Sequence, residues 1–193
     1  MSAPYSRFAP LGAEMLEMVR VWRNSPRISD NMLDNQLITA AQQKSWFLGL
    51  EGDASRRYLV FHLHDIPVGM LYFTEIEEHR CNWGCYLGAE AVWPGSGLLL
   101  EVAALDYAFT QLNVDCLRAA VLEFNQAPQR IHRIFRYRLV ERQPDALQRD
   151  GQSHALLHYE YWRQDWLSNR ETVLAQLPRQ IREAIELISF INN

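Results

Sequence analysis

The sequence Pro94-Gly95-Ser96-Gly97 has the residue types of an anion-binding turn. It lies between a predicted strand over residues 82–87 and a predicted helix, where the first backbone N–H groups have no intrahelical partner and attract negative charge. Glycine at positions 95 and 97 would let a pyrophosphate approach those groups without meeting a Cβ. An ordinary loop before a helix is the alternative, because Gly-x-Gly alone is a weak motif.

Glu123, Asn125 and His132 form a second candidate group after a predicted strand over residues 115–124. An imidazole titrates near neutral pH, so His132 could donate a proton. Asn125 could cap the next helix or bind a ligand. Glu123 shares a strand face with apolar residues, so we expect it to project inward with a raised pKa and act as a base. A surface histidine and a carboxylate at the rim of the core are the alternatives.

Other candidate groups are weaker. Arg23 and Asn24 could clamp an anionic substrate, although an aromatic residue packed at a helix end also explains Trp22-Arg23-Asn24. The other histidines lack a carboxylate or cysteine that would complete a metal-binding set, so we expect no metal. The chain contains no Gly-x-Ser-x-Gly sequence, so a serine hydrolase is unsupported.

Hydrophobic periodicity predicts the elements that position these groups. Predicted helices cover residues 13–22, 39–50, 98–109 and 126–137, and predicted strands cover residues 5–10, 58–63, 68–76, 82–87, 115–124, 138–143 and 153–162. Three consecutive strands between residues 58 and 87 predict an antiparallel meander, and the uncharged strand after residue 115 predicts a central position. Together they predict an α+β fold with a mixed, mostly antiparallel sheet flanked by helices.

Two helical segments carry apolar stripes. After the glycine turn, residues 98, 102, 105 and 109 form one stripe, with Glu101 predicted to lie off it. Residues 167–193 are predicted to form a helical extension after a domain over residues 1–166, with isoleucines at 181, 185, 188 and 191 on one face. We expect that face to pack on its own domain, with a homodimer contact as the alternative.

Composition limits the class of protein. The 193 residues suit one domain with a short appendage, and 48% apolar content suits a globular core. A net charge of −4 argues against nucleic-acid binding. Lys44 is the one lysine, and arginine suits recognition of phosphate, although codon usage explains the bias equally well. We expect no signal peptide, no membrane span and three reduced cysteines, as in a cytoplasmic protein.

The order strand, Pro-Gly-Ser-Gly, amphipathic helix, strand, Glu-Phe-Asn, helix resembles the acetyl-CoA core of the GNAT superfamily of acetyltransferases. The resemblance implies that the glycine turn holds the pyrophosphate of acetyl-CoA. It also implies that the preceding strand splays from its neighbour and that its backbone binds pantetheine. The residues implied to bind acetyl-CoA are Cys85, Tyr86, Leu87, Gly95, Ser96, Gly97 and Asn125.

The same resemblance implies direct acyl transfer in a ternary complex. His132 stands where the family usually has a tyrosine that protonates the departing thiolate. Glu123 would accept the proton of the attacking amine through water, and backbone N–H groups of the splayed strand would stabilise the oxyanion. These roles are expectations for the structure to test.

The chain further resembles the branch of the superfamily that serves pseudaminic acid biosynthesis. That branch acetylates the 4-amino group of UDP-4-amino-4,6-dideoxy-N-acetyl-β-L-altrosamine, a precursor of sugars on flagellin and surface glycans. The segments that carry the resemblance are Val21-Trp22-Arg23-Asn24, Ile38-Thr39 leading to Trp46, Gly69-Met70-Leu71-Tyr72-Phe73-Thr74-Glu75-Ile76, Asp106-Tyr107-Ala108-Phe109 and Val121-Leu122-Glu123-Phe124-Asn125.

This narrower resemblance implies that a UDP-amino sugar is the acceptor. Arg23 would meet the diphosphate, and Asn24 is the second residue expected at the substrate. Two alternatives stay open: acetylation of a protein α-amine, because such enzymes share the layout, and a non-catalytic module that binds coenzyme A or a partner. A UDP-sugar pocket should be stabilised by UDP, whereas a peptide groove should not.

Overall fold

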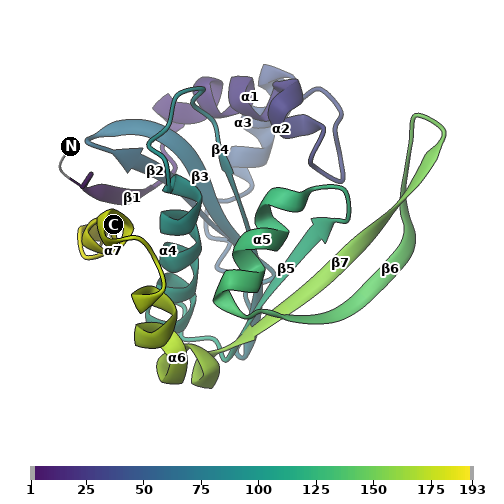
Figure 1. Cartoon of the computed structure of the whole chain (residues 1–193). Helices are drawn as coiled ribbons and strands as arrows, with labels where there is room; N and C mark the ends of the chain where they lie inside the picture. The colour runs from purple at the N-terminus through teal and green to yellow at the C-terminus, as the bar shows by residue number, and fades with distance from the viewer. Residues whose placement is uncertain (1–2, 192–193) are drawn as a thin grey trace.

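A computed structural model describes residues 3–191 of the chain (Figure 1). Eight strands of this part form one sheet in the order β6-β7-β5-β4-β3-β2-β1-β8. Neighbouring strands are antiparallel except for the pairs β4–β5 and β1–β8, which are parallel. The strands are β1 (Ser6–Pro10), β2 (Arg57–Leu63), β3 (Ile66–Thr74), β4 (Arg80–Leu87), β5 (Cys116–Leu122), β6 (Arg138–Arg149), β7 (Gln152–Trp162) and β8 (Ile188–Phe190). The predicted α+β class and antiparallel meander are confirmed.

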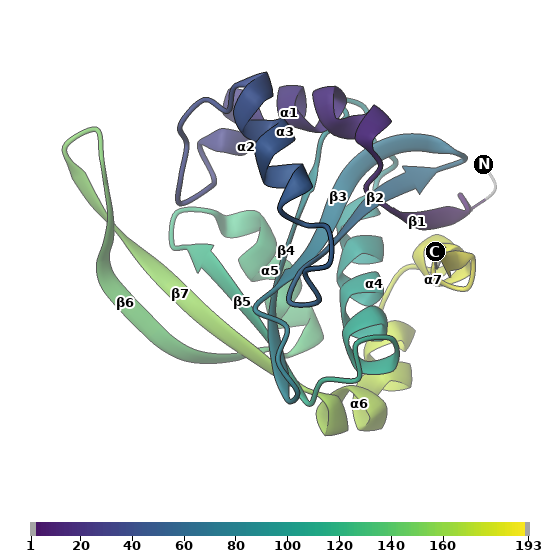
Figure 2. The same ribbon diagram turned by 180° about the vertical axis from the view of Figure 1, so that it is seen from behind.

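Helices cover both faces of the sheet, as the opposite views in Figures 1 and 2 show. They are a 3-10 turn (Ala13–Met15), α1 (Leu16–Asn24), α2 (Pro26–Ser29), α3 (Ala40–Leu48), α4 (Ser96–Thr110), α5 (Gln126–Phe135), α6 (Arg163–Ala175) and α7 (Arg179–Ile185). Alternate residues of β2 serve the two faces: Val60 packs with α1 and α3, whereas Leu59 and Phe61 pack in the larger core around α4.

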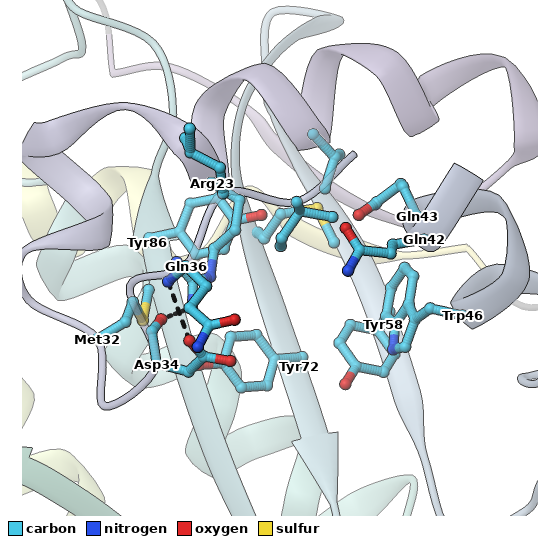
Figure 3. Close-up of a pocket in the computed structure, with 14 residues that line it drawn as sticks. Arg23, Met32, Asp34, Gln36, Gln42, Gln43, Trp46, Tyr58, Tyr72 and Tyr86 are labelled. Atoms are coloured by element: carbon cyan, nitrogen blue, oxygen red, sulfur yellow. Dashed lines mark hydrogen bonds between the residues drawn. The ribbon is translucent and has the colours of Figure 1, made fainter. Parts of the chain in front are cut away.

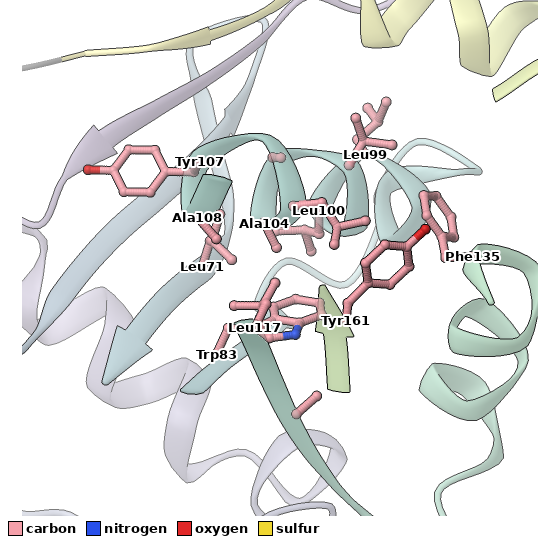
Figure 4. Close-up of a cluster of buried hydrophobic side chains, with 14 of the residues drawn as sticks. Leu71, Trp83, Leu99, Leu100, Ala104, Tyr107, Ala108, Leu117, Phe135 and Tyr161 are labelled. Carbon is pink, nitrogen blue, oxygen red and sulfur yellow. The ribbon is translucent and has the colours of Figure 1, made fainter. Parts of the chain in front are cut away.

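Helix α4 is buried on almost every side, which differs from the predicted single stripe. Of its 15 residues 11 are buried, so Glu101 lies in the interior and not off the apolar face. The reason is that the sheet covers one side of α4 while α5 and α7 cover others. Figure 4 shows Leu99 and Leu100 of α4 near Phe135 of α5, with Trp83 of β4 below the helix.

Strands β4 and β5 pair along a short stretch only. In the described residues their register runs from Arg80–Cys116 to Asn82–Arg118, whereas β4 stays paired with β3 from Asn82 to Leu87. The two strands therefore separate after Asn82, as the family resemblance implied. This separation opens one side of β4 in the middle of the sheet.

The C-terminal tail differs from the predicted helical extension. Helix α6 starts at Arg163, and the isoleucine stripe ends at Ile185. The chain then forms β8, whose neighbours Leu187 and Ile191 exchange backbone hydrogen bonds with β1 at 3.1 and 2.8 Å. An exposed strand edge has unpaired N–H and C=O groups, so pairing with the edge of β1 outweighs continuation of the helix.

Smaller differences occur elsewhere. The first predicted helix begins with a 3-10 turn, and α2 forms where no helix or strand was predicted. Strand β6 continues to Arg149, beyond the predicted end at residue 143. All three cysteines are free thiols. No helix within residues 3–191 has the length and apolar character that a membrane span requires.

The glycine turn yields a test of packing. Gly95 has φ 108°, and a Cβ there would lie 2.0 Å from Cδ1 of Ile181 on α7. We predict that Gly95→Ala lowers the free energy of unfolding by about 2 kcal/mol or more, because backbone strain and a clash add together. Urea denaturation measures the loss.

Gly151→Ala is the matched control. Gly151 has φ 73° in the β6–β7 turn, and a Cβ there meets no described atom within 4 Å. It isolates the cost of the left-handed backbone, about 1 kcal/mol. Equal losses in the two variants would show that α7 does not hold the glycine turn through this contact.

Candidate active site

The separation of β4 and β5 forms a cleft of about 370 Å³. Its walls come from both strands, from the N-terminal turn of α4 and from one face of α5. Six residues predicted to bind acetyl-CoA or to move a proton line it: Cys85, Tyr86, Leu87, Gly97, Asn125 and His132. The structure thus brings together groups that are far apart in the sequence.

The open side of β4 can bind an extended polar ligand. In an antiparallel pair, alternate residues direct their N–H and C=O groups to the partner strand and the intervening residues direct theirs away. From Trp83 to Leu87, β4 bonds to β3 on one side, and β5 is no longer paired on the other. Arg27 closes the far end of this edge, donating hydrogen bonds to the carbonyl oxygens of Leu87 (2.9 Å) and Gly88 (2.7 Å).

The glycine turn reaches the cleft through Gly97. Gly95 is the N-cap of α4, and Gly97 lies in the cleft wall. Ser96, in contrast, is 1% exposed, and its hydroxyl and N–H both donate to the carbonyl oxygen of Trp93, at 2.7 and 3.1 Å. The prediction that Ser96 contacts the ligand is therefore corrected: its polar groups stabilise the turn from inside.

Asn125 is the N-cap residue of α5, and its side chain makes no capping hydrogen bond among the described residues. Two roles were predicted for this side chain, capping the helix and binding a ligand. The capping bond is absent, and the side chain lies in the cleft wall. The amide stays available to a ligand.

His132 is a buried residue, so the surface alternative is excluded. It is 2% exposed, its ring stacks on Tyr137 with centroids 4.4 Å apart, and Tyr159 lies edge-on at 4.8 Å. Burial lowers the pKa of His132 to about 4, which leaves the imidazole neutral at physiological pH. A neutral imidazole still has one N–H to donate.

Glu101 faces His132 from α4. Its Oε2 lies 3.9 Å from His132 Nε2, beyond hydrogen-bond distance, and burial raises the pKa of Glu101 to about 8. Glu101 Oε1, His132 Nδ1, the Tyr137 hydroxyl and the Trp83 indole N–H are all buried with no hydrogen-bond partner in the described part of the chain. Unpaired polar atoms are rare in interiors, so four in one cluster mark this place as unusual.

Glu101 was not among the site residues predicted from the sequence. The available signal was its setting, because apolar residues precede and follow it on nearly every side of the helix. A helix that is apolar all round is buried, so a carboxylate within it must be buried as well.

Glu123 is corrected. The prediction placed it inward with a raised pKa, but β5 ends at Leu122 and the chain turns, with Asn125 N–H donating to Leu122 O at 2.8 Å. Strand alternation therefore no longer applies, and Glu123 lies outside the cleft in an ion pair with Arg142 (2.6 Å). Its hydrogen bonds to Arg142 lower its pKa. The structure does not bring this carboxylate to the cleft.

A second pocket of about 420 Å³ joins the cleft and shares Met32, Tyr72 and Tyr86 with it. Trp46 and Tyr58 lie across this pocket from Arg23 and Tyr86 in Figure 3. The Trp46 and Tyr58 rings are edge-on at 4.8 Å, and those of Tyr58 and Tyr72 stack at 5.6 Å. Gln36, Gln42 and Gln43 add amide groups, and Asp34 is the one carboxylate of the lining. We call this cavity the acceptor pocket.

Arg23 lines the acceptor pocket, whereas Asn24 does not. The Arg23 side chain lines the acceptor pocket; one guanidinium nitrogen donates to Asp34 O, and another, Nη1, is buried without a partner among residues 3–191. Asn24 forms two hydrogen bonds with the backbone of Ile38, at 2.8 and 2.9 Å, and is absent from the pocket lining. Its role is to hold the segment that carries Asp34 and Gln36.

Comparison with known proteins identifies the class. Residues 7–136 match the family model described as Acetyltransferase (GNAT) domain, so the chain belongs to this family. Acetyltransferase PseH of Campylobacter jejuni is 26% identical over 125 residues, which cover 65% of this chain and 78% of that protein. The same figures hold for the PseH of a second strain. The chain is an N-acetyltransferase.

Solved structures share the fold. Spermidine N-acetyltransferase from Vibrio cholerae, in complex with CoA and spermine, has a TM-score of 0.80 at 15% identity and covers 84% of this chain and 98% of its own. An N-acetyltransferase from Staphylococcus aureus has a TM-score of 0.70 at 16% identity, with 81% and 98% covered. At this identity the likeness concerns the fold alone.

The buried pair predicts a pH dependence of stability. Between the usual glutamate pKa of 4.5 and the folded value of about 8, the native state holds a proton on Glu101 that the unfolded state releases. Stability therefore falls as pH rises through this window, by up to about 1.4 kcal/mol per pH unit. His132 has the opposite effect: between about 4 and 6.5 the unfolded state binds the extra proton, and stability rises with pH.

Glu101→Gln removes the loss of stability with rising pH that Glu101 causes and leaves the effect of His132 in place. We predict that its free energy of unfolding, relative to the wild type, increases as pH rises from about 5 to about 8. Urea denaturation across that range measures it, with Glu123→Gln as the control that shows no such gain. A difference in the free energy of unfolding between Glu101→Gln and the wild type that stays constant with pH would contradict a raised pKa for Glu101.

Proposed function

We propose that this chain transfers an acetyl group from acetyl-CoA to the 4-amino group of a UDP-linked amino-deoxy sugar, in nonulosonic (pseudaminic) acid biosynthesis in the cytoplasm. The observation that carries the proposal is the acceptor pocket: it is aromatic, rich in amides, supplied with one arginine, and continuous with the β4–β5 cleft. The likeness to acetyltransferase PseH supports the same branch of the family.

The charge of the acceptor pocket favours a sugar over a polyamine. Polyamines such as spermidine are polycations, and their recognition calls for several carboxylates. The described lining supplies one carboxylate, Asp34, together with the guanidinium of Arg23. Aromatic faces and neutral amides suit a nucleobase and a hydroxylated ring instead.

Arg23 is the group that fits the diphosphate. Its buried Nη1 has no partner in the described chain, and a buried guanidinium N–H without a partner is costly. Phosphate oxygens accept hydrogen bonds from arginine in pairs. Burial also raises the pKa of Tyr72 to about 12, so its hydroxyl stays a donor at neutral pH.

The cleft fits acetyl-CoA. Gly97, in the N-terminal turn of α4, offers its backbone N–H as an anion site for the pyrophosphate, because the neighbouring N–H groups of Ser96 and Leu98 donate within the turn. The open edge of β4 over Cys85, Tyr86 and Leu87 offers hydrogen bonds to pantetheine. Acetyl-CoA supplies the activated acyl group. Because Tyr72 and Tyr86 border both cavities, an amine held in the acceptor pocket can meet a thioester held in the cleft.

The proposed chemistry uses few protein groups. A neutral amine attacks the thioester carbonyl, and N–H groups on the open edge of β4 stabilise the oxyanion. His132 donates a proton to the departing thiolate. Glu123 has no part in this scheme because it lies outside both cavities.

UDP binding tests the acceptor class. We predict that UDP, at about 100 times its Kd, raises the melting temperature by about 5 °C or more, because it binds the folded state alone. Arg23→Gln should weaken UDP binding about 10-fold or more, since a charge-assisted pair of hydrogen bonds is lost. Arg179→Gln on the exposed face of α7 is the control and should bind UDP normally. Spermidine stabilisation without UDP stabilisation would refute a nucleotide-sugar pocket.

His132→Phe tests the proton donor. The aromatic ring keeps the packing against Tyr137 and Tyr159 while it removes the N–H. We predict that kcat falls by about 100-fold or more with KM values little changed. Unchanged turnover in a variant with a native circular dichroism spectrum would end this role for His132.

A further inference from the structure

Glu101 is a buried acid that the scheme above leaves unused. It lies in the second turn of α4, is 3% exposed, and borders the cleft beside His132. Its Oε1 has no hydrogen-bond partner among residues 3–191. Burial disfavours the ionised carboxylate, so the folded chain keeps Glu101 in its neutral, protonated form near pH 7.

The groups that face Glu101 come from four elements, and none of them supplies a positive charge. His132 approaches from α5, Cys85 from β4, Tyr161 from β7, and Tyr137 from the turn before β6. Burial raises the pKa of the Cys85 thiol and of both tyrosines and lowers that of His132, so all four are neutral near pH 7. The carboxyl proton is therefore the most acidic proton of the cluster.

The Tyr137 hydroxyl and the His132 imidazole are the polar groups that act on the Glu101 carboxyl at close range. Of the two, the neutral imidazole is the base that can accept the proton. Glu101 Oε2 is 3.9 Å from His132 Nε2, about 1 Å longer than a hydrogen bond, and such contacts often tighten when substrates bind. The other ring nitrogen, Nδ1, has no partner in the described residues. His132 thus lies at the border of the cleft with Nε2 toward an acid, while Nδ1 is buried and has no partner that would compete for its proton.

We propose that Glu101 stores the proton that His132 delivers to the thiolate of coenzyme A. Glu101 acts through the imidazole and is a positioning residue that never touches the substrate. This inference rests on the proposed function, because it assumes acetyl transfer in the β4–β5 cleft.

The proton balance is complete. As the amine nitrogen bonds to the carbonyl carbon, the C–S bond breaks and its electron pair goes to sulfur. The Nδ1 proton of His132 moves to sulfur while the carboxyl proton of Glu101 moves to Nε2. The products are the amide, the free thiol, a neutral imidazole in its other tautomer and an ionised Glu101. The proton that leaves the attacking nitrogen enters the solvent, and solvent exchange restores the Glu101 proton and the starting tautomer.

The arrangement has a pH signature. Glu101 holds its proton below about pH 8, and His132 stays neutral above about pH 4. Between these two pH values Glu101 is protonated and His132 is neutral. We therefore expect kcat to fall on the alkaline side as Glu101 loses its proton.

Glu101→Gln tests the proposal kinetically. Glutamine keeps the size and polarity of the acid but cannot supply its proton. We expect kcat for thiol release from acetyl-CoA to fall by about 10-fold to 100-fold at neutral pH, with unchanged KM values and no alkaline limb near pH 8. Glu101→Asp restores an ionisable group and should regain an alkaline limb at reduced kcat. Exposed Glu51→Gln is the control and should keep the wild-type profile.

Infrared spectroscopy tests the protonation state without any substrate. The difference spectrum of wild type minus Glu101→Gln should contain a carboxylic-acid carbonyl band at pH 7 that disappears on titration through pH 8. A carboxylate band at pH 7, or an unchanged kcat and pH profile in Glu101→Gln, overturns the proposal. If no acetyl acceptor is found, the proposed function fails, and the infrared band still decides whether Glu101 holds a proton.

Discussion

The separation of β4 from β5 after Asn82 is the constraint on which the rest of the structure depends. Each strand keeps its outer partner, so the sheet stays continuous while its centre opens. The opening leaves backbone groups of β4 without a strand partner and brings the N-terminal ends of α4 and α5 to the same space. A sheet paired along its full length would have no room for a ligand there.

Packing below the opening stabilises it. Trp83 follows directly after the last residue of β4 that pairs with β5, and its ring lies 6.1 Å from that of His132 on α5. Tyr137 and Tyr159 close the other sides of the imidazole. These rings exclude water, and the exclusion explains why Glu101 and His132 are both neutral. The cleft is therefore a place where a proton can be moved but a fixed charge is costly.

Local patterns predicted most of the fold because they report local physics. A helix was predicted to begin at residue 39, and Thr39 forms a capping box with Gln42 at the start of α3. Strand alternation located β2, β3 and β4. Local patterns could not predict β8 in the C-terminal tail, because Ile188 pairs with Ser6 of β1, which is nearly the whole chain away in sequence. The edge of β1 that β8 joins exists only in the assembled sheet.

The site was predictable in outline and not in its surroundings. Residue type and spacing drew attention to Gly97 and His132, which both line the cleft, and their roles stay predictions. The predicted inward position of Glu123 was wrong because β5 ends at Leu122, one residue before Glu123, so the alternation of strand faces does not extend to it. Glu101 and the aromatic wall of the acceptor pocket were missed because burial and convergence of distant segments are tertiary properties.

The most direct test of this account is a comparison of acetyl acceptors. Initial rates of thiol release from acetyl-CoA would be measured with a UDP-4-amino-4,6-dideoxy sugar, with spermidine and with a peptide that has a free α-amine. The account predicts a kcat/KM for the nucleotide sugar at least about 100-fold above the other two, because the acceptor pocket supplies one arginine and one carboxylate. An equal or higher kcat/KM with spermidine or the peptide would contradict it.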